Sequence, residues 1–487
     1  MTALRARTTP SGHQAATSGE FRGLTGLRIV AAVWVVLFHF HFTPLPGVAE
    51  AVGVLGPLIT SGALGVDLFF VLSGFVIAHT YLDQLGPAFR AGATARFLWA
   101  RVCRMWPVYA LVFHLFGLWL VARLVFGSDP EIAFQAVQPG VDAGQYVQQL
   151  FLVQLWDDPF LDGASWVGPT WSISAEWLAY LLFPVAALVF FRLRNLPIAV
   201  LGAAALALMT PIAWAYLSTG SPYYPWSWLV RILCGFGGGV LMYLAVRRLR
   251  STGGVRRTAS WLAVAVPVLI AAGLLLGELV APGRGGAVIV LFPLLVAALA
   301  LADRGPAMVL SAPWAVYGGR ISYSLYLVHI PIFEVYWLAL RRFAWLRLES
   351  LLAHVVGVLV VLSTLVVAAV AYRWVEEPAR SRMRAMAPVA ALRALVARLR
   401  PRRVPAATVP PTVARFAAQR QALADLAAAD TSAPAPLPRH AASPFRPATL
   451  AAALINAQRR RPAHRAEMWA AYERAEYVRG GYLHAGN

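Results

Sequence analysis

The sequence of 487 residues lacks lysine, and all 42 of its basic residues are arginine. Enzymes that form a Schiff base or hold pyridoxal phosphate need an ε-amino group, and so does the phosphate-binding loop of P-loop NTPases. The absence of lysine therefore excludes these classes. Cysteine is almost absent too: Cys103 and Cys234 are the only two, and they lie in very different sequence surroundings. A small scaffold held together by disulfides is thereby excluded.

Charged residues are also scarce. They make up 13% of the chain, against about a quarter in ordinary soluble domains. Hydrophobic residues make up 59%, so too little polar surface remains to cover a water-facing globule of this size. The same hydrophobicity excludes a disordered chain, despite the formal net charge of +20. We therefore expect most of the chain to be surrounded by lipid.

Long apolar runs recur along the chain. A hydrocarbon core of roughly 30 Å takes about 20 helical residues to cross. Runs of about this length predict an all-α, polytopic integral membrane protein with about ten transmembrane helices. The expected spans lie near 25–43, 61–82, 105–126, 171–191, 197–217, 227–246, 260–281, 285–302, 320–340 and 350–372.

Ten crossings place both termini on one side, and arginine indicates which side, because cytoplasmic loops are enriched in it. The longest loop on the opposite side, 127–170, contains no arginine and six acidic residues. We therefore expect both termini to be cytoplasmic, in a bacterial cytoplasmic membrane. The exceptions are Arg341, Arg342 and Arg347, which fall in a short loop on the outer side. Either this loop departs from the rule locally, or one of the predicted spans is misplaced. The arginines on the N-terminal side are Arg5, Arg7, Arg22, Arg90, Arg96, Arg101, Arg104, Arg192, Arg194, Arg247, Arg248, Arg250, Arg256, Arg257 and Arg304.

The positive charge is concentrated at the C-terminal end. Residues 380–487 contain 18 arginines and five acidic residues, a net charge of +13. We therefore predict an N-terminal tail over 1–23, a transmembrane domain over 24–378, and a basic, partly helical or disordered cytoplasmic tail over 379–487. The pattern of Val389–Arg403 is typical of an interfacial helix on anionic lipid. The tail could also hold a cytoplasmic partner, but nothing in it indicates a nucleic-acid module.

The first span carries two polar residues, Arg28 and His39. A polar side chain inside a membrane is costly and is a functional hypothesis by default. Eleven residues make about three helical turns, so the two side chains share a face and lie roughly 16 Å apart. A neutral imidazole at a water-accessible cavity can take a proton from a hydroxyl. The alternative is a buried histidine bonded to a neighbouring helix. His41 points elsewhere and is expected at the interface.

Arg101 and Arg104 lie before the third span at i, i+3 and present adjacent guanidinium groups. Such a fork suits phosphate groups. The alternative is that positive-inside bias alone explains both.

Acidic residues begin the second and fourth spans. Asp67 is ambiguous from the sequence and is assigned to the substrate pocket, whereas Ser73 and Gly74 indicate close helix packing. Glu176 could orient a base, bind a sugar hydroxyl, or pair with Arg231 as a structural partner.

The ninth span carries Ser322, Tyr326 and His329 on one stripe, at spacings of four and three. A polar stripe on an apolar helix must face protein or water, and we expect it to line the same cavity as the first span. The cysteines are singletons and no His-x-x-x-His pair occurs, so no metal site is expected.

Taken together, the sequence resembles the membrane acyltransferase-3 family, bacterial proteins that acylate sugars and related molecules. The resemblance runs from Gly23 to Pro378. Its markers, in order, are Leu27-Arg28 with His39, Gly65–Phe75, Arg101-x-x-Arg104 with Pro107 and Tyr109, Trp171–Glu176 with Tyr180 and Phe183-Pro184, Ser322–His329, and Val375-Glu-Glu-Pro378.

The resemblance implies that an acyl group, usually acetyl, passes from cytoplasmic acyl-CoA to a hydroxyl of a glycan or glycosylated small molecule. It implies that His39 is the base or a transient acyl carrier, supported by Arg28. Arg101 and Arg104 would hold the CoA phosphates, and Glu176 would shape the pocket together with Ser322–His329. Many relatives have a second acid where this chain has Trp177. We find no hydrolase-like motif, so the membrane domain is expected to act alone or with a separate partner.

A function of another class stays open from the sequence. Membrane-embedded histidine and glutamate also suit a proton-coupled path. The alternative is a transporter or flippase that exports an acylated or glycan-type molecule.

Overall fold

The computed structural model describes residues 20–127, 131–386 and 418–423. Every regular element in these ranges is helical, and they contain no strand. The chain divides into two units, 1–390 and 391–487. In the second unit the described residues, 418–423, are helical. The interfacial helix predicted over Val389–Arg403 lies outside the described residues.

Ten helical segments of the described residues are long and apolar enough to cross a membrane, so the prediction of an all-α polytopic membrane protein is confirmed. Each overlaps one predicted span. The third, Ala91–Phe126, is longer than predicted because its helix begins well before the apolar run. The last continues through a π-helical turn to Ala385.

The first half of the bundle precedes the sixth span. Its elements are α1 (Arg22–Phe40), α2 (Pro46–Leu55), α3 (Pro57–Thr60), η1 (Ser61–Ala63), α4 (Leu64–Leu85), α5 (Ala91–Phe126), α6 (Ala143–Leu150), η2 (Gly168–Thr170), α7 (Trp171–Leu193), α8 (Ile198–Ala207) and α9 (Thr210–Thr219).

The second half begins with the sixth span. Its elements are α10 (Ser227–Val246), α11 (Gly253–Val280), η3 (Arg284–Leu291), α12 (Phe292–Leu301), α13 (Pro306–Leu310), α14 (Pro313–Arg342), α15 (Leu351–Ala371), the π-helical η4 (Tyr372–Glu376) and α16 (Glu377–Ala385).

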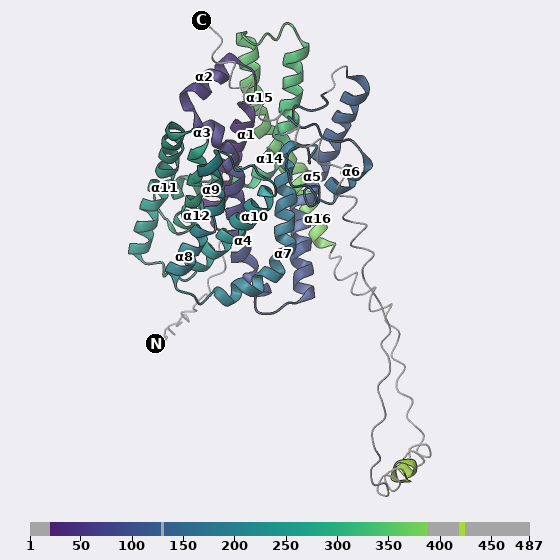
Figure 1. Ribbon diagram of the computed structural model, residues 1–487, viewed down its shortest axis with the longest axis vertical. Helices are drawn as coiled ribbons and strands as arrows, with labels where there is room; N and C mark the ends of the chain where they lie inside the picture. Colours follow the sequence, from purple (N-terminus) through teal and green to yellow (C-terminus); the bar gives the residue numbers. More distant parts are fainter. Residues whose placement is uncertain (1–19, 128–130, 387–417, 424–487) are drawn as a thin grey trace, which may run out of the picture. The chain divides into compact units, whose positions relative to one another are not determined.

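Two close helix pairs build the centre of the bundle, α4 with α10 and α1 with α14 (Figure 1). Glycine permits both approaches. A Cβ on Gly239 of α10 would overlap the carbonyl of Val71, and a Cβ on Gly319 of α14 would overlap that of Thr25. Small residues allow helices in lipid to approach in this way. The second pair brings the polar residues of the first and ninth spans together.

The peripheral helices expose apolar side chains. In α10 and α4, 83% and 78% of the most apolar stretch is buried inside the protein, whereas the share is 22% in α11 and 28% in the last span. Leu276 of α11 and Val358 of α15 are examples of exposed apolar residues. Many exposed apolar side chains on long helices are expected of an integral membrane protein, whose outer helices face lipid.

Candidate functional site

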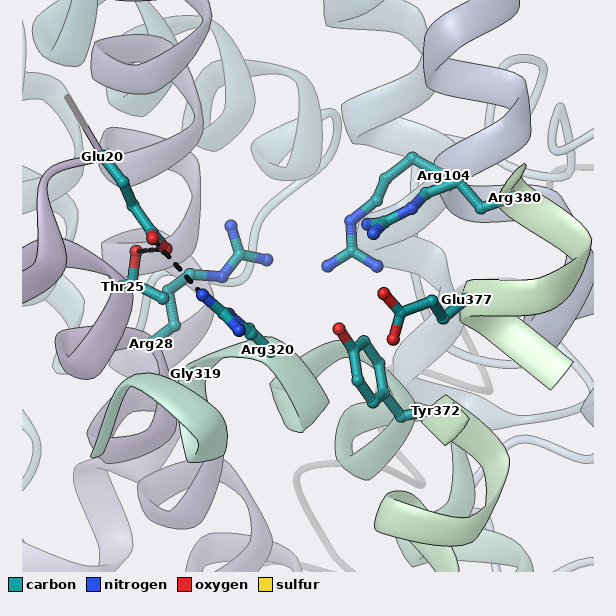
Figure 2. Close-up of a pocket in the computed structure, with 9 residues that line it drawn as sticks. All are labelled: Glu20, Thr25, Arg28, Arg104, Gly319, Arg320, Tyr372, Glu377 and Arg380. Atoms are coloured by element: carbon teal, nitrogen blue, oxygen red, sulfur yellow. Dashed lines mark hydrogen bonds and ion pairs between the residues drawn. The ribbon is translucent and has the colours of Figure 1, made fainter. Parts of the chain in front are cut away.

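An open cavity lies at the end of the bundle where α1 begins (Figure 2). Its volume is about 380 Å³. Residues from the beginning and the end of the membrane unit line it, in agreement with an even number of crossings. We call it the arginine cavity. Its lining residues are Glu20, Thr25, Arg28, Arg104, Gly319, Arg320, Tyr372, Glu377 and Arg380.

Arg28 and Arg104 point into this cavity from different helices (Figure 2). The Nε of Arg28 donates to the hydroxyl of Ser322 on α14 over 3.4 Å. Arg104 forms an ion pair with the buried Glu376, whose other oxygen accepts from Ser324 over 2.8 Å. The side chain of Arg104 is nevertheless 20% exposed. Both guanidinium groups are therefore held by α14 or its neighbours and still reach open space.

Arg101 has different surroundings from Arg104, although the sequence predicted one phosphate-binding fork. It donates to the hydroxyl of Tyr81 over 3.3 Å. Its guanidinium carbon also lies 5.4 Å from the Tyr81 ring centre and 5.7 Å from that of Tyr180. Arg101 is not among the residues that line the arginine cavity. Spacing within a helix sets the direction of a side chain, but the packed neighbours decide what it meets.

His39 contacts His329, the last residue of the polar stripe on α14. The Nδ1 of His39 lies 3.2 Å from the Nε2 of His329, and the ring centres are 4.9 Å apart. His39 and His329 therefore meet across the same helix pair that joins Arg28 to Ser322. His39 therefore does contact a neighbouring helix, as the alternative interpretation expected. The contact uses only the Nδ1 of His39, so its Nε2 is left for another partner.

The hydrogen bonds assign the protons of the two rings. The Nδ1 of His39 lies 2.9 Å from the carbonyl of Val35, and the Nδ1 of His329 lies 3.3 Å from that of Leu325. A carbonyl oxygen only accepts, so in neutral rings both Nδ1 atoms carry the proton. The single Nδ1 proton of His39 is then shared between the carbonyl of Val35 and the Nε2 of His329, both of which accept. The Nε2 of His39 keeps a lone pair and makes no hydrogen bond with the described residues.

His41 does not join this pair. It lies beyond the end of α1, and its ring contacts the carbonyl of Phe38. Burial lowers the pKa of His41. It is a natural control for substitutions of His39.

Tyr326 and Ser172 hold the junction that precedes α7. The hydroxyl of Tyr326 donates to the carbonyl of Pro169 over 2.7 Å and lies 2.7 Å from the hydroxyl of Ser172. Both side chains are buried. They connect α14 to α7, beside the histidine pair.

Glu176 is bound within the protein by two hydroxyl groups. Ser73 donates to it over 2.6 Å and Tyr180 over 2.5 Å. The idea that Glu176 pairs with Arg231 is wrong, because Arg231 pairs with Asp67. Ser73, predicted to serve packing, also positions this carboxylate.

Asp67 and Arg231 form a closed pair between α4 and α10. The two carboxylate oxygens accept from Nε and Nη2 over 2.9 and 2.8 Å. The side chains are 0% and 1% exposed. Both oxygens of Asp67 are thus occupied by an arginine, and the residue stabilises the α4–α10 contact instead of presenting a free carboxylate to a substrate pocket.

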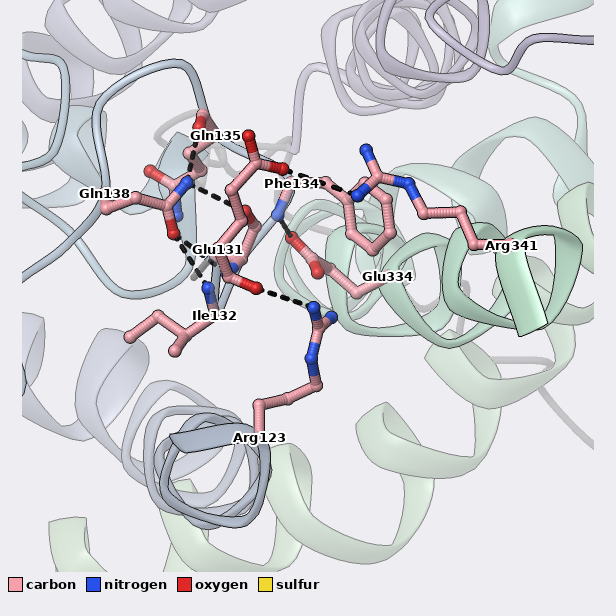
Figure 3. A network of polar contacts seen from close by, with 9 residues as sticks. Arg123, Glu131, Ile132, Phe134, Gln135, Gln138, Glu334 and Arg341 are labelled. Atoms are coloured by element: carbon pink, nitrogen blue, oxygen red, sulfur yellow. Dashed lines mark hydrogen bonds and ion pairs between the residues drawn. The ribbon is translucent and has the colours of Figure 1, made fainter. Parts of the chain in front are cut away.

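Glu334, a buried acid at the other end of α14, was not predicted from the sequence (Figure 3). It accepts from the backbone N–H of Phe134 over 2.7 Å. In the same loop Glu131 lies 3.4 Å from Arg341, and its carbonyl accepts from Arg123 over 2.6 Å. Arg341 therefore contacts the acidic loop, and the predicted ninth span is not misplaced, because a helix covers Pro313–Arg342.

Arg320, Arg380, Glu376 and Glu377 were also not assigned a role from the sequence. The two acids belong to the closing Val375-Glu-Glu-Pro378 marker, and Arg320 lies just before the stripe on α14. The rule that selected His39, that polar residues inside apolar spans are functional, would have selected Glu334 within the predicted span 320–340. Glu376 follows the predicted span 350–372 and would not have been selected. No group of three or more potential ligands that could hold a metal ion occurs in the part of the chain that the structure describes.

Comparison with known proteins gives matches over the same region. Residues 21–373 match the model of the acyltransferase-3 family, described as "Acyltransferase domain". Acyltransferase MdmB of Streptomyces mycarofaciens is 29% identical over 330 residues, which cover 63% of this chain and 78% of that protein. Protein 2 in the picA locus of Rhizobium radiobacter is 34% identical over 161 residues, 31% of this chain and 75% of that protein.

A third relative matches a smaller part. O-acetyltransferase OatA of Staphylococcus aureus is 28% identical over 166 residues, which cover 34% of this chain and 24% of that protein. No solved structure matches the chain.

Proposed function

The chain belongs to the membrane acyltransferase-3 family, and from that premise we propose that it moves an acyl group, acetyl in the simplest case, from cytoplasmic acyl-CoA to a hydroxyl of a glycan or glycosylated small molecule. Relatives named acyltransferase and O-acetyltransferase support transfer to oxygen. The observation that carries the proposal is the His39–His329 contact, which leaves the Nε2 of His39 available.

In the proposed reaction His39 acts as a general base. Its Nε2 takes the proton of the acceptor hydroxyl while the oxygen attacks the thioester carbonyl. The carbon–sulfur bond breaks, and the proton passes from His39 to the leaving thiolate. The products are the ester and free CoA. His329 helps to position the base, because its Nε2 and the carbonyl of Val35 both accept the Nδ1 proton of His39, so that the lone pair stays on the Nε2 of His39.

We assign the arginine-rich end of the bundle to the cytoplasm. Arginine enrichment supports this orientation, and in this orientation the arginine cavity opens toward the cytoplasm. A donor that enters there reaches His39 along α1, while the acceptor approaches from the side of the acidic loop.

The test uses the full chain in proteoliposomes with labelled acetyl-CoA and the glycan and metabolite fraction of a deletion strain as acceptor. Mass spectrometry of that fraction against the parent strain identifies the acceptor. We expect His39→Ala to lower acetyl transfer and release of the CoA thiol by roughly 10²- to 10⁴-fold, the usual contribution of a general base. The matched control, His41→Ala, keeps the wild-type rate.

Two results contradict the proposal. A folded His39→Ala variant that transfers acetyl at the wild-type rate removes the assigned base. A wild-type protein that releases no CoA thiol with any acceptor fraction, but moves the acceptor across the bilayer, is a carrier.

A further inference from the structure

Four arginines from four helices surround the arginine cavity. Arg28 comes from α1, Arg104 from α5, Arg320 from α14 and Arg380 from α16. The lining also includes two carboxylates, from Glu20 and Glu377, so its net formal charge is +2. A concave site whose lining has a net positive charge attracts anions. The cavity is therefore suited to an anion with more than one negative group.

We propose that Arg320 and Arg380 complete, with Arg28 and Arg104, a cradle for the phosphate groups of the acyl donor. This inference rests on the proposed function. It replaces the Arg101–Arg104 pair, because Arg101 is stacked on Tyr81 and Tyr180 outside the cavity. Planar guanidinium groups bind phosphate oxygens in forked pairs of hydrogen bonds.

The distance from the cradle to His39 fits the length of the donor. Eleven residues of α1 separate Arg28 from His39, which is a rise of roughly 16 Å. The pantetheine arm of CoA places about a dozen bonds between its diphosphate and its sulfur. An extended chain covers about 3.5 Å for every three bonds, so the arm spans nearly the same distance. When the diphosphate is held in the cradle, the arm is thus long enough for the thioester to reach the base.

The volume limits how much of the donor the cavity can hold. A whole acyl-CoA molecule exceeds about 380 Å³, so only part of it fits, and the arginine lining favours the phosphate-bearing part. Glu20 is already engaged, by Thr25 over 3.0 Å and by Arg320 over 3.4 Å.

Removing the charge of Glu377 should change phosphate binding in the opposite direction from removing the charge of an arginine. Its carboxylate points into the same space as the guanidinium groups (Figure 2), so it repels bound phosphate. Without the charge of Glu377 the cradle should bind phosphate more tightly, whereas without the charge of Arg320 or Arg380 it should bind phosphate more weakly. A residue with a purely structural role would not show this reversal.

The experiment measures binding of CoA to the full chain in nanodiscs of phosphatidylcholine. We expect Arg320→Gln and Arg380→Gln each to weaken CoA binding about three- to ten-fold, a modest effect because partly exposed charges are screened by water. Glu377→Gln should bind CoA about two- to five-fold more tightly. The matched control is Arg382→Gln, which removes the same charge from an exposed position of the same helix outside the cavity.

The outcomes test phosphate binding by the four arginines separately from acyl transfer. Wild-type binding by both arginine variants, or equal weakening by Arg382→Gln, overturns the cradle even if thiol release continues. Phosphate-dependent CoA binding without thiol release supports the cradle and contradicts the transferase. Loss of CoA binding in nanodiscs that contain phosphatidylglycerol assigns the cradle to lipid headgroups and overturns the donor assignment. S-acetyl-pantetheine, which has no phosphate, should react equally well with the wild type and both arginine variants.

Discussion

Two arginine–carboxylate pairs lie inside the helical bundle, and their surroundings differ. Arg231 and Asp67 are almost completely shielded from solvent, and the rings of Trp171 and Tyr223 cover the guanidinium, with centres 4.9 and 5.6 Å from its carbon. Arg104 pairs with the equally buried Glu376, but its own side chain is 20% exposed and reaches the arginine cavity.

The difference shows what an arginine inside a membrane protein can do. In a closed pair the two charges interact with each other, and the pair stabilises the contact between two helices. An open pair uses the carboxylate to hold the arginine in place while other N–H groups remain available to a ligand. The same two residue types thus serve the fold in one region and the candidate site in the other.

The largest expected effect concerns the closed pair. Asp67→Asn should lower the free energy of unfolding by about 3–5 kcal/mol, because the buried charge of Arg231 loses its counter-charge. Thermal unfolding in detergent measures this. The control is Asp83→Asn on the same helix, since Asp83 and Arg247 join the same two helices in an exposed pair over 3.0 Å. That pair should contribute less than about 1 kcal/mol.

The structural role of Asp67 would be contradicted if the Asp67→Asn protein were as stable as the Asp83→Asn protein but lost acyl transfer. Asp67 would then serve the substrate, as the sequence analysis assigned it.

A smaller effect is expected at the open pair. Arg104→Gln should lower kcat/KM for acyl-CoA about 10- to 100-fold, mainly through KM, since hydrogen bonds to charged groups contribute about 1.5–3 kcal/mol. It should also destabilise the protein, because Glu376 is left as an unpaired buried carboxylate. The double variant Arg104→Gln/Glu376→Gln should recover stability without recovering donor affinity. Recovery of both would make the pair purely structural, like Asp67–Arg231.

The smallest expected effect is a dependence of the KM for acetyl-CoA on salt concentration, which follows from the open pair and not from the closed one. Raising the ionic strength from about 0.05 to 0.5 M shortens the Debye length several-fold, so the KM for acetyl-CoA should rise about two- to five-fold. The KM for S-acetyl-pantetheine should stay constant because it carries no phosphate. A KM for acetyl-CoA that does not change with salt would argue against phosphate binding in the open cavity.

The sequence was a good guide along each helix. Hydropathy predicted ten spans, and each overlaps a span of the structure. Spacing predicted that Arg28 and His39 share a face of the first span, and both contact α14. These predictions hold because the helical period depends only on the local backbone.

Contacts between helices could not be predicted in the same way. The partner of Arg231 is Asp67 and not Glu176, although both acids stand in apolar spans. Arg101 and Arg104 are three residues apart, yet one meets Tyr81 and the other Glu376. Glu334 binds a backbone N–H of a loop 200 residues earlier in the chain. Each choice depends on which helices pack together.

The sequence by itself determined the membrane environment, the number of spans and the residues on each helical face, because hydrophobicity and helical spacing are local properties. The tertiary structure alone decided that His39 contacts His329, that one arginine–carboxylate pair is closed and the other open, and that four arginines distant in the sequence surround one cavity. These features depend on close approaches such as Gly319 against Thr25, and whether two helices meet there is decided by the packing of the whole bundle.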